Sequence, residues 1–235
     1  GYYHWYTPDS WNDGNINFYD GYTDIINLKN LNIENKETPN KEMLNLNSIE
    51  DYDLDNNSLL IAKQIELLEK YNIDGFGMYY YWFSINTITN NNTIMYNIHE
   101  KFLNAELKGK KIFFIWANEN WSDNPAFGSS NNIVKNIYNK KNFNKQFNLL
   151  IKAFKSDNYL KNNNKPVFYI HHPWCFTNNY ELTTFIEKLD EECIKHNFDG
   201  IDIKLNNMNK EYTKNVYEFH PNYKKTKTIK YIDGK

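Results

Sequence analysis

The chain has 235 residues, which allows one large domain or two small ones, and with 40% hydrophobic and 17% aromatic residues a core would be built on Tyr, Phe and Trp. Its net charge is −2 and no block of basic residues stands out. This argues against nucleic acid as the main partner, because phosphate binding needs clustered positive charge. No segment approaches the ~20 consecutive apolar residues of a membrane-spanning helix.

Two cysteines, Cys175 and Cys193, lie too far apart for a Cys-x-x-Cys motif and are too few for a disulfide framework. Together with the lack of a visible signal peptide, this favours free thiols in a reducing compartment such as the cytoplasm. The chain opens at Gly1, without Met, directly on an apolar run. We therefore expect residues 1–235 to form a single domain that is excised from, or truncated within, a longer protein.

Short apolar or aromatic runs alternate with amphipathic stretches along the chain. The apolar runs predict strands at 1–6, 75–83, 111–117, 166–172, 200–206 and 215–221. Most of these runs are continuously apolar, which is typical of parallel strands covered on both faces. The amphipathic stretches predict helices at 58–71, 95–107, 143–156 and 182–196. The polar segment 27–57, rich in Asn, Glu and Lys, predicts a long surface loop.

An alternation of strands and helices requires a parallel sheet with right-handed crossovers, either a β/α barrel or an open doubly wound sheet. No glycine-rich phosphate-binding turn follows any predicted strand, so the nucleotide-binding forms of the open sheet lack support. Polar and aromatic residues gather at the C-terminal ends of several strands, where a β/α barrel builds its site. We therefore predict an α/β fold, a TIM-type (β/α)8 barrel that is incomplete at the C-terminus of this chain.

The stretch IWANENW at 115–121 combines aromatic, amide and carboxylate side chains at the end of a predicted strand. Indole faces can stack on a pyranose ring, while amides and a carboxylate bind its hydroxyls. The alternative is that both tryptophans are core residues and the asparagines reflect the Asn-rich composition. We favour a site, because burying a carboxylate between two indoles without a role would cost free energy. The residues concerned are Trp116, Asn118, Glu119, Asn120 and Trp121.

Two other strand ends carry candidate residues. Tyr79 and Tyr81 lie two apart and share one face of their strand, so we expect at least one of them in the pocket. His171 and His172 precede Cys175, but adjacent side chains on a strand point to opposite faces and no carboxylate is near in sequence. We therefore expect His171 at the mouth of the site as a hydrogen-bond donor, and neither a metal nor a cofactor.

The last predicted strand carries Glu218 and His220, which lie on one face because they are two residues apart. A glutamate in such a place can be a general acid, a general base or an ion-pair partner. No nucleophilic serine, zinc-protease or Cys/His signature is present. Paired carboxylates with aromatic rings are typical of glycoside chemistry, so Glu119 and Glu218 are the candidate catalytic pair.

Four runs, YNIDGFGMYYYWF, KIFFIWANENW, NNNKPVFYIHHP and VYEFHP, resemble in order and spacing the WbsX-like family, also called glycoside hydrolase family 99-like. The early GYTDIINLKN also resembles a segment of that family, with Asp24 where the family has Glu. The resemblance implies a (β/α)8 barrel that acts on glycans in polysaccharide or glycoconjugate processing. It also implies an oligosaccharide or polysaccharide partner, with mannose-containing glycans among the candidates.

The chain departs from the related endo-mannosidases in one respect. Their catalytic carboxylates lie in an Asn-Glu-Trp-x-Glu-Gly-like segment after the region that VYEFHP resembles, and this chain reaches Lys235 before any such segment. Two functions therefore stay open: a glycosidase or glycosyltransferase-like enzyme, and a catalytically inactive glycan-binding module of a larger protein. In either case the residues expected to bind the glycan are Tyr3, Asp24, Tyr79, Tyr81, Trp116, Asn118, Asn120, Trp121, His171 and His220.

Overall fold

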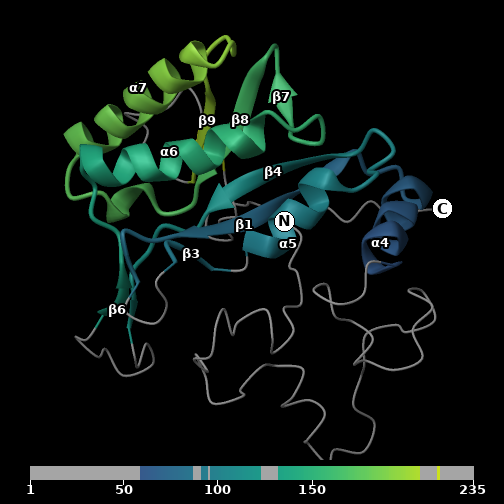
Figure 1. Cartoon of the computed structure of the whole chain (residues 1–235), viewed down its shortest axis with the longest axis horizontal. Coiled ribbons are helices and arrows are strands. Elements are labelled where there is room, and N and C mark those ends of the chain that lie inside the picture. The colour runs from purple at the N-terminus through teal and green to yellow at the C-terminus, as the bar shows by residue number, and fades with distance from the viewer. Residues whose placement is uncertain (1–58, 87–90, 95, 123–131, 207–215, 218–235) are drawn as a thin grey trace, which may run out of the picture.

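A computed structural model describes residues 59–86, 91–94, 96–122, 132–206 and 216–217 of the chain (Figure 1). The expected strand at 1–6, the expected loop at 27–57 and most of the expected strand at 215–221 lie outside these ranges. Four candidate site residues also lie outside them: Tyr3, Asp24, Glu218 and His220.

Helices occur at all four places where the sequence predicts them: α4 (Leu59–Lys70), α5 (Tyr96–Asn104), α6 (Lys140–Phe154) and α7 (Asn179–Lys195). α7 begins earlier than predicted, because the side chain of Asn178 accepts a hydrogen bond from the N–H of Glu181 and so caps the helix. Asn139 caps α6 in the same way. Hydrophobic periodicity marks the buried face of a helix and misses such polar first turns. Among these four helices, none has the length and apolar character that crossing a membrane requires.

The strands form a mostly parallel sheet. Along its main path lie β1 (Gly75–Trp82), β3 (Thr93–Ile94), β4 (Lys111–Trp116), β8 (Lys165–Ile170), β9 (Asp202–Asn206) and β10 (Val216–Tyr217). A seventh described strand, β7 (Lys161–Asn162), pairs with β8 off this path. Across the sheet the order is β10-β9-β8-β4-β1-β3, and among the described strands of this sheet only β3, at the edge, and β7 run antiparallel to a neighbour. The parallel strands therefore follow one another in chain order. This mixed α/β fold with a mostly parallel sheet confirms the α/β part of the prediction.

The two faces of the sheet have different surroundings. On one face, Phe114, Phe168 and Ile203 lie in register across β4, β8 and β9 and are buried in the core with residues of the helices. α6 and α7 lie side by side next to β8 and β9 (Figure 1). Because side chains alternate along a strand, the opposite face carries Phe113 and Tyr169, whose half-buried rings lie 4.7 Å apart.

A second, antiparallel sheet follows the C-terminal ends of β1 and β4. It consists of β2 (Ile85–Asn86), β5 (Trp121–Ser122) and β6 (Asn132–Lys135) in the order β2-β6-β5. β6 projects away from the helices (Figure 1). The sequence does not predict these strands, because segments of two to four residues are too short to show alternation. This small sheet lies directly beside the candidate site, since β5 begins with Trp121 of the IWANENW stretch.

Local features hold β8 at both of its ends. Before it, β7 (Lys161–Asn162) forms a hairpin through Asn163 and Asn164, whose φ angles of 48° and 58° are those of a two-residue turn that suits the twist of the strands. After it, the short 3-10 helix η3 (Pro173–Cys175) begins within three residues of the strand. The residues that follow β8 therefore stay close to the C-terminal end of this strand.

Two buried tyrosines of the core differ in their hydrogen bonding. The hydroxyl of Tyr159 donates to the carbonyl of Val167 at 2.9 Å and accepts from the N–H of Phe114 at 3.1 Å. The hydroxyl of Tyr80 is buried and has no hydrogen-bond partner within the described ranges. We expect Tyr159→Phe to lower the free energy of unfolding by about 1–3 kcal/mol, because two buried backbone groups lose a partner.

Tyr80→Phe is the matched control for this prediction. It removes a buried hydroxyl without breaking a hydrogen bond, so we expect the free energy of unfolding to stay the same or to rise slightly. Urea denaturation of both variants measures the difference. An equal loss of stability in the two variants would contradict the hydrogen-bond account of this part of the core.

Candidate functional site

Asn118 connects the ends of β4 and β8, two neighbouring strands of the main sheet. Regular pairing ends where the N–H of His171 donates to the carbonyl of Trp116 at 2.9 Å. Beyond that point the side chain of Asn118, which is fully buried, continues the connection. Its Oδ1 accepts from the N–H of His172 and its Nδ2 donates to the carbonyl of His172, both at 2.8 Å. The backbone of His172 is therefore held in a fixed place relative to β4.

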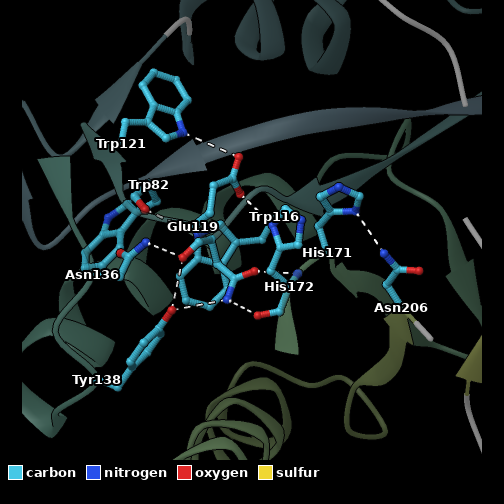
Figure 2. Close-up of polar contacts among 10 residues, drawn as sticks. Trp82, Trp116, Glu119, Trp121, Asn136, Tyr138, His171, His172 and Asn206 are labelled. Atoms are coloured by element: carbon cyan, nitrogen blue, oxygen red, sulfur yellow. Dashed lines mark hydrogen bonds and ion pairs between the residues drawn. The ribbon is translucent and has the colours of Figure 1, made fainter. Parts of the chain in front are cut away.

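The backbone of Asn118 is itself held by the segment before α6. Its carbonyl accepts hydrogen bonds from the hydroxyl of Tyr138 and from Nδ2 of Asn136, each at 3.1 Å (Figure 2). Burial raises the pKa of Tyr138, so its hydroxyl stays neutral and can donate. Oδ1 of Asn120 accepts from the N–H of Asn136 at 2.9 Å. Asn118 and Asn120, both expected to bind a glycan, thus make structural hydrogen bonds.

Glu119 lies between these two asparagines and is bound by two side chains. Its Oε2 is 2.8 Å from Nδ1 of His172, and its Oε1 accepts from Nε1 of Trp121 at 3.4 Å (Figure 2). The side chain of Glu119 is 34% exposed and that of His172 is 24% exposed, so solvent or a ligand can reach the pair. The carboxylate is therefore held in one orientation and stays accessible.

The charge of Glu119 follows from its surroundings. Burial raises the pKa of its carboxyl, but the hydrogen bond and charge of His172, its own backbone N–H and the indole of Trp121 outweigh that effect. The pKa is therefore lower than the ordinary value, and Glu119 is ionised at neutral pH. An ionised carboxylate can accept a proton or stabilise positive charge, but it cannot act as a general acid.

The histidines correct one expectation from the sequence. Neither His171 nor His172 has a carboxylate near it in sequence, yet His172 binds Glu119, which lies 53 residues earlier. Parallel pairing of β4 and β8 brings the two strand ends together. The sequence signal for this was partial: both motifs directly follow predicted strands, but it does not show that the two strands are neighbours. His171 takes a different place: its Nδ1 is 3.4 Å from Nδ2 of Asn206, and its ring is edge-on to Tyr79 at 5.5 Å.

The aromatic side chains of β1 and β5 extend the site. The ring of Trp121 is edge-on to Tyr81 at 5.3 Å and to Phe83 at 5.1 Å. Tyr81 is in turn stacked on Tyr79 at 6.3 Å, and Tyr79 contacts His171. These contacts bring together five of the residues that the sequence predicts for the site: Tyr79, Tyr81, Glu119, Trp121 and His171.

Trp116 lies in the core instead. It is 1% exposed, and its ring is stacked on Phe185 at 5.1 Å and on Phe168 at 6.4 Å. Its Nε1 donates to the carbonyl of Trp82 at 3.2 Å. With both faces of the indole covered, Trp116 has no surface to offer a sugar, so the core alternative considered for IWANENW applies to this residue. The difference from Trp121 arises because Trp116 is the last residue of β4 and points to the helix side.

The two cysteines are poorly suited to nucleophilic chemistry, because their surroundings raise the pKa of both thiols. Burial, and to a smaller extent the negative charge of Glu119, raises the pKa of Cys175 to about 11, so the thiol stays protonated and is a poor nucleophile. Burial likewise raises the pKa of Cys193 to about 12. Within the described ranges no group of three or more His, Cys, Asp or Glu side chains could hold a metal ion. At the C-terminal ends of β4 and β8, the side chains suited to acid–base chemistry are therefore those of Glu119 and His172.

A family model described as Glycosyltransferase WbsX matches residues 13–233. The chain belongs to this family. The match spans almost the whole sequence and includes IWANENW and the stretch after β8, so it confirms the resemblance inferred from these motifs. Comparison with curated proteins gives no match, and comparison with solved structures gives none either. The family description places the Glu119–His172 pair in a chain related to enzymes that act on glycans.

The role of Asn118 can be tested by removing its amide. We expect Asn118→Ala to lower the free energy of unfolding by about 1–3 kcal/mol, because the N–H and carbonyl of His172 lose buried partners. Asn120→Ala is the control, since it removes an acceptor from a more exposed N–H and should cost less. Chemical denaturation measures both, and a larger loss for Asn120→Ala would contradict the account.

The pKa of Glu119 gives a prediction on pH. Because its pKa in the folded chain is lower than the ordinary value of 4.5, its ionised form contributes stability above that pH. This contribution is lost as the pH falls through the folded pKa. We expect Glu119→Gln to lower the melting temperature at about pH 7, and the difference from the parent to shrink towards about pH 3. Thermal melts across this range measure it, and a difference independent of pH would contradict the pKa shift.

Proposed function

We propose that the chain is an enzyme that acts on glycans, with Glu119 as a catalytic carboxylate. The observation that carries this proposal is the state of Glu119: partly exposed, ionised and oriented by His172 and Trp121. In reactions at a glycosidic carbon, an ionised carboxylate accepts a proton from the attacking hydroxyl or stabilises the positive charge of the transition state. The description of the family favours transfer of a sugar to an acceptor over hydrolysis.

The same proposal extends to the fold, for which we propose a closed (β/α)8 barrel. Two observations support closure. The parallel strands follow one another in chain order, whereas the order in a doubly wound sheet reverses at a switch point. The face away from the core bears the half-buried rings of Tyr79, Phe113 and Tyr169, which in a barrel belong to the interior. In such a barrel the strand ends that carry Glu119 and His172 line the mouth.

If the reaction is cleavage of a glycosidic bond, it requires a second carboxylate, because Glu119 is ionised and cannot serve as the acid. Glu218, the partner expected from the sequence, follows β10 and lies outside the described ranges. We propose that it takes this role. A separation of ~5–5.5 Å between the two carboxyl groups would suit retention at the anomeric carbon, and ~6.5–9.5 Å would suit inversion.

The alternative is a glycan-binding module without activity. It is favoured by one observation, that Glu119 is the single carboxylate among the described residues in contact with His172 and Trp121. The two functions differ in turnover. A binding module would bind glycans and release them unchanged, whereas the enzyme would cleave or transfer them.

Glu119→Gln tests the catalytic role. It keeps the shape of the side chain and one acceptor oxygen but removes the charge, so we expect kcat to fall about 100-fold or more, with a smaller loss of glycan affinity. Glu191→Gln is the control, because it removes an exposed carboxylate that pairs with Lys188 on α7. Assays of hydrolysis and transfer on mannose-containing oligosaccharides, run beside calorimetric titration, measure the two quantities. Unchanged turnover in Glu119→Gln would refute the proposal, and binding without turnover in the parent would establish the module.

The two tryptophans of IWANENW should respond differently in the same assays. Trp116→Ala removes a buried indole and should lower the free energy of unfolding by about 3–5 kcal/mol. Trp121→Ala releases the carboxylate of Glu119 from one hydrogen bond and should reduce turnover with a smaller loss of stability. Loss of stability without loss of turnover in Trp121→Ala would place Trp121 in the core as well.

A further inference from the structure

Trp174 exposes a large aromatic ring next to the Glu119–His172 pair. It lies in η3, directly after β8, and is 56% exposed. Its ring centroid is 4.8 Å from that of His172, and the two rings are edge to face. Exposed single aromatics are common on protein surfaces, but this ring contacts the histidine that binds the carboxylate of the site. Its position therefore suggests a ligand contact.

The backbone around Trp174 is held in place before any ligand arrives. The N–H of Cys175 donates to the carbonyl of His172 at 2.9 Å, which closes the turn of η3. Pro173 is buried, and Phe176, the residue that follows η3, is stacked on Tyr138 at 4.0 Å. Because Asn118 holds the backbone of His172, the turn that presents Trp174 is fixed relative to Glu119. With the backbone held, only the two side-chain torsions of Trp174 remain to be ordered when a ligand binds, which keeps the entropy cost small.

We propose that Trp174 is the stacking surface of a sugar subsite, in which a neutral pyranose ring lies against the indole and its hydroxyls bind Glu119 and His172. The inference rests on the proposed function and names the substrate class of the same site. C–H faces of a pyranose pack well on an indole, and the hydroxyls at its rim need the polar groups that the pair supplies. Trp174 and the pair thus provide both kinds of contact side by side.

Trp121 is less suited to stacking than Trp174. Tyr81 and Phe83 pack against its ring, and its N–H donates to Glu119. Its contribution is to orient the carboxylate. The subsite therefore uses the two tryptophans for different purposes: Trp121 hydrogen-bonds the carboxylate of Glu119, and Trp174 provides the stacking face.

The charge of Glu119 sets the sugar class. Among the described residues, no lysine contacts Glu119 or His172 through a side-chain hydrogen bond or ion pair. A uronic or sialic acid bound there would bring a second carboxylate close to the first, and the like charges would repel each other. The subsite therefore prefers neutral sugars.

Calorimetric titration with neutral oligosaccharides of mannose, glucose, galactose and N-acetylglucosamine tests the subsite. We expect Trp174→Ala to raise the Kd of the bound glycan about five- to tenfold, and Trp174→Phe to restore most of the affinity because it keeps an aromatic face. Tyr180→Ala is the control: Tyr180 is 79% exposed on α7, and its removal should leave Kd unchanged. Melting temperatures should stay close to that of the parent, because both rings are exposed.

The outcomes separate this subsite from the proposed function. If the parent binds a glycan and Trp174→Ala binds it equally well, the subsite is wrong and the proposed function stands. If the parent binds none of the panel, both are wrong. Binding of oligogalacturonides as tightly as neutral glycans overturns the preference for neutral sugars. Should Trp174→Ala unfold, Trp174→Phe and Trp174→Leu decide, because both keep apolar bulk and only Phe keeps an aromatic face; equal affinities in these two variants overturn the stacking.

Discussion

Two hydrogen bonds between the side chain of Asn118 and the backbone of His172 hold the site together. They extend the pairing of β4 and β8 past the point where regular strand geometry ends. An asparagine amide suits this place because it offers a donor and an acceptor side by side, as a peptide unit does. Buried away from water, both bonds are costly to break. Glu119, after the end of β4, and His172, after the end of β8, are consequently held within hydrogen-bond distance of each other.

The small antiparallel sheet has a comparable effect on the aromatic side of the site. β5 and β6 turn the chain back after IWANENW, so that Trp121 lies against Tyr81 and Phe83 with its N–H directed at Glu119. The carboxylate thus receives hydrogen bonds from two directions. In these half-buried surroundings, each bond has a larger effect on its charge than it would in water. The hydrogen bonds that His172 and Trp121 make with Glu119 therefore affect both the stability of this site and the charge of its carboxylate.

Membership of the WbsX family and the geometry of the strand ends support one another. The family description concerns glycans, and the site combines an oriented carboxylate, a histidine and aromatic rings, which are the groups that recognise and process sugars. The parallel strands that follow one another in chain order place these groups where a β/α barrel would carry its catalytic residues. These groups therefore support the glycan-acting function that we propose.

The sequence by itself determined the α/β class, the four helices and the strands that carry the site, because hydrophobic periodicity and run length reflect burial, which is local. It also singled out IWANENW, since that mixture of side chains at a strand end is chemically unusual. It could not separate Trp116 from Trp121: which indole is buried depends on side-chain direction at the exact end of β4 and on the short strands of the second sheet. The pairing of Glu119 with His172, and the exposure of Trp174 beside them, were decided only by the tertiary structure. Residues 53 positions apart meet because β4 and β8 are neighbours in register, and no local pattern in the chain records that neighbourhood.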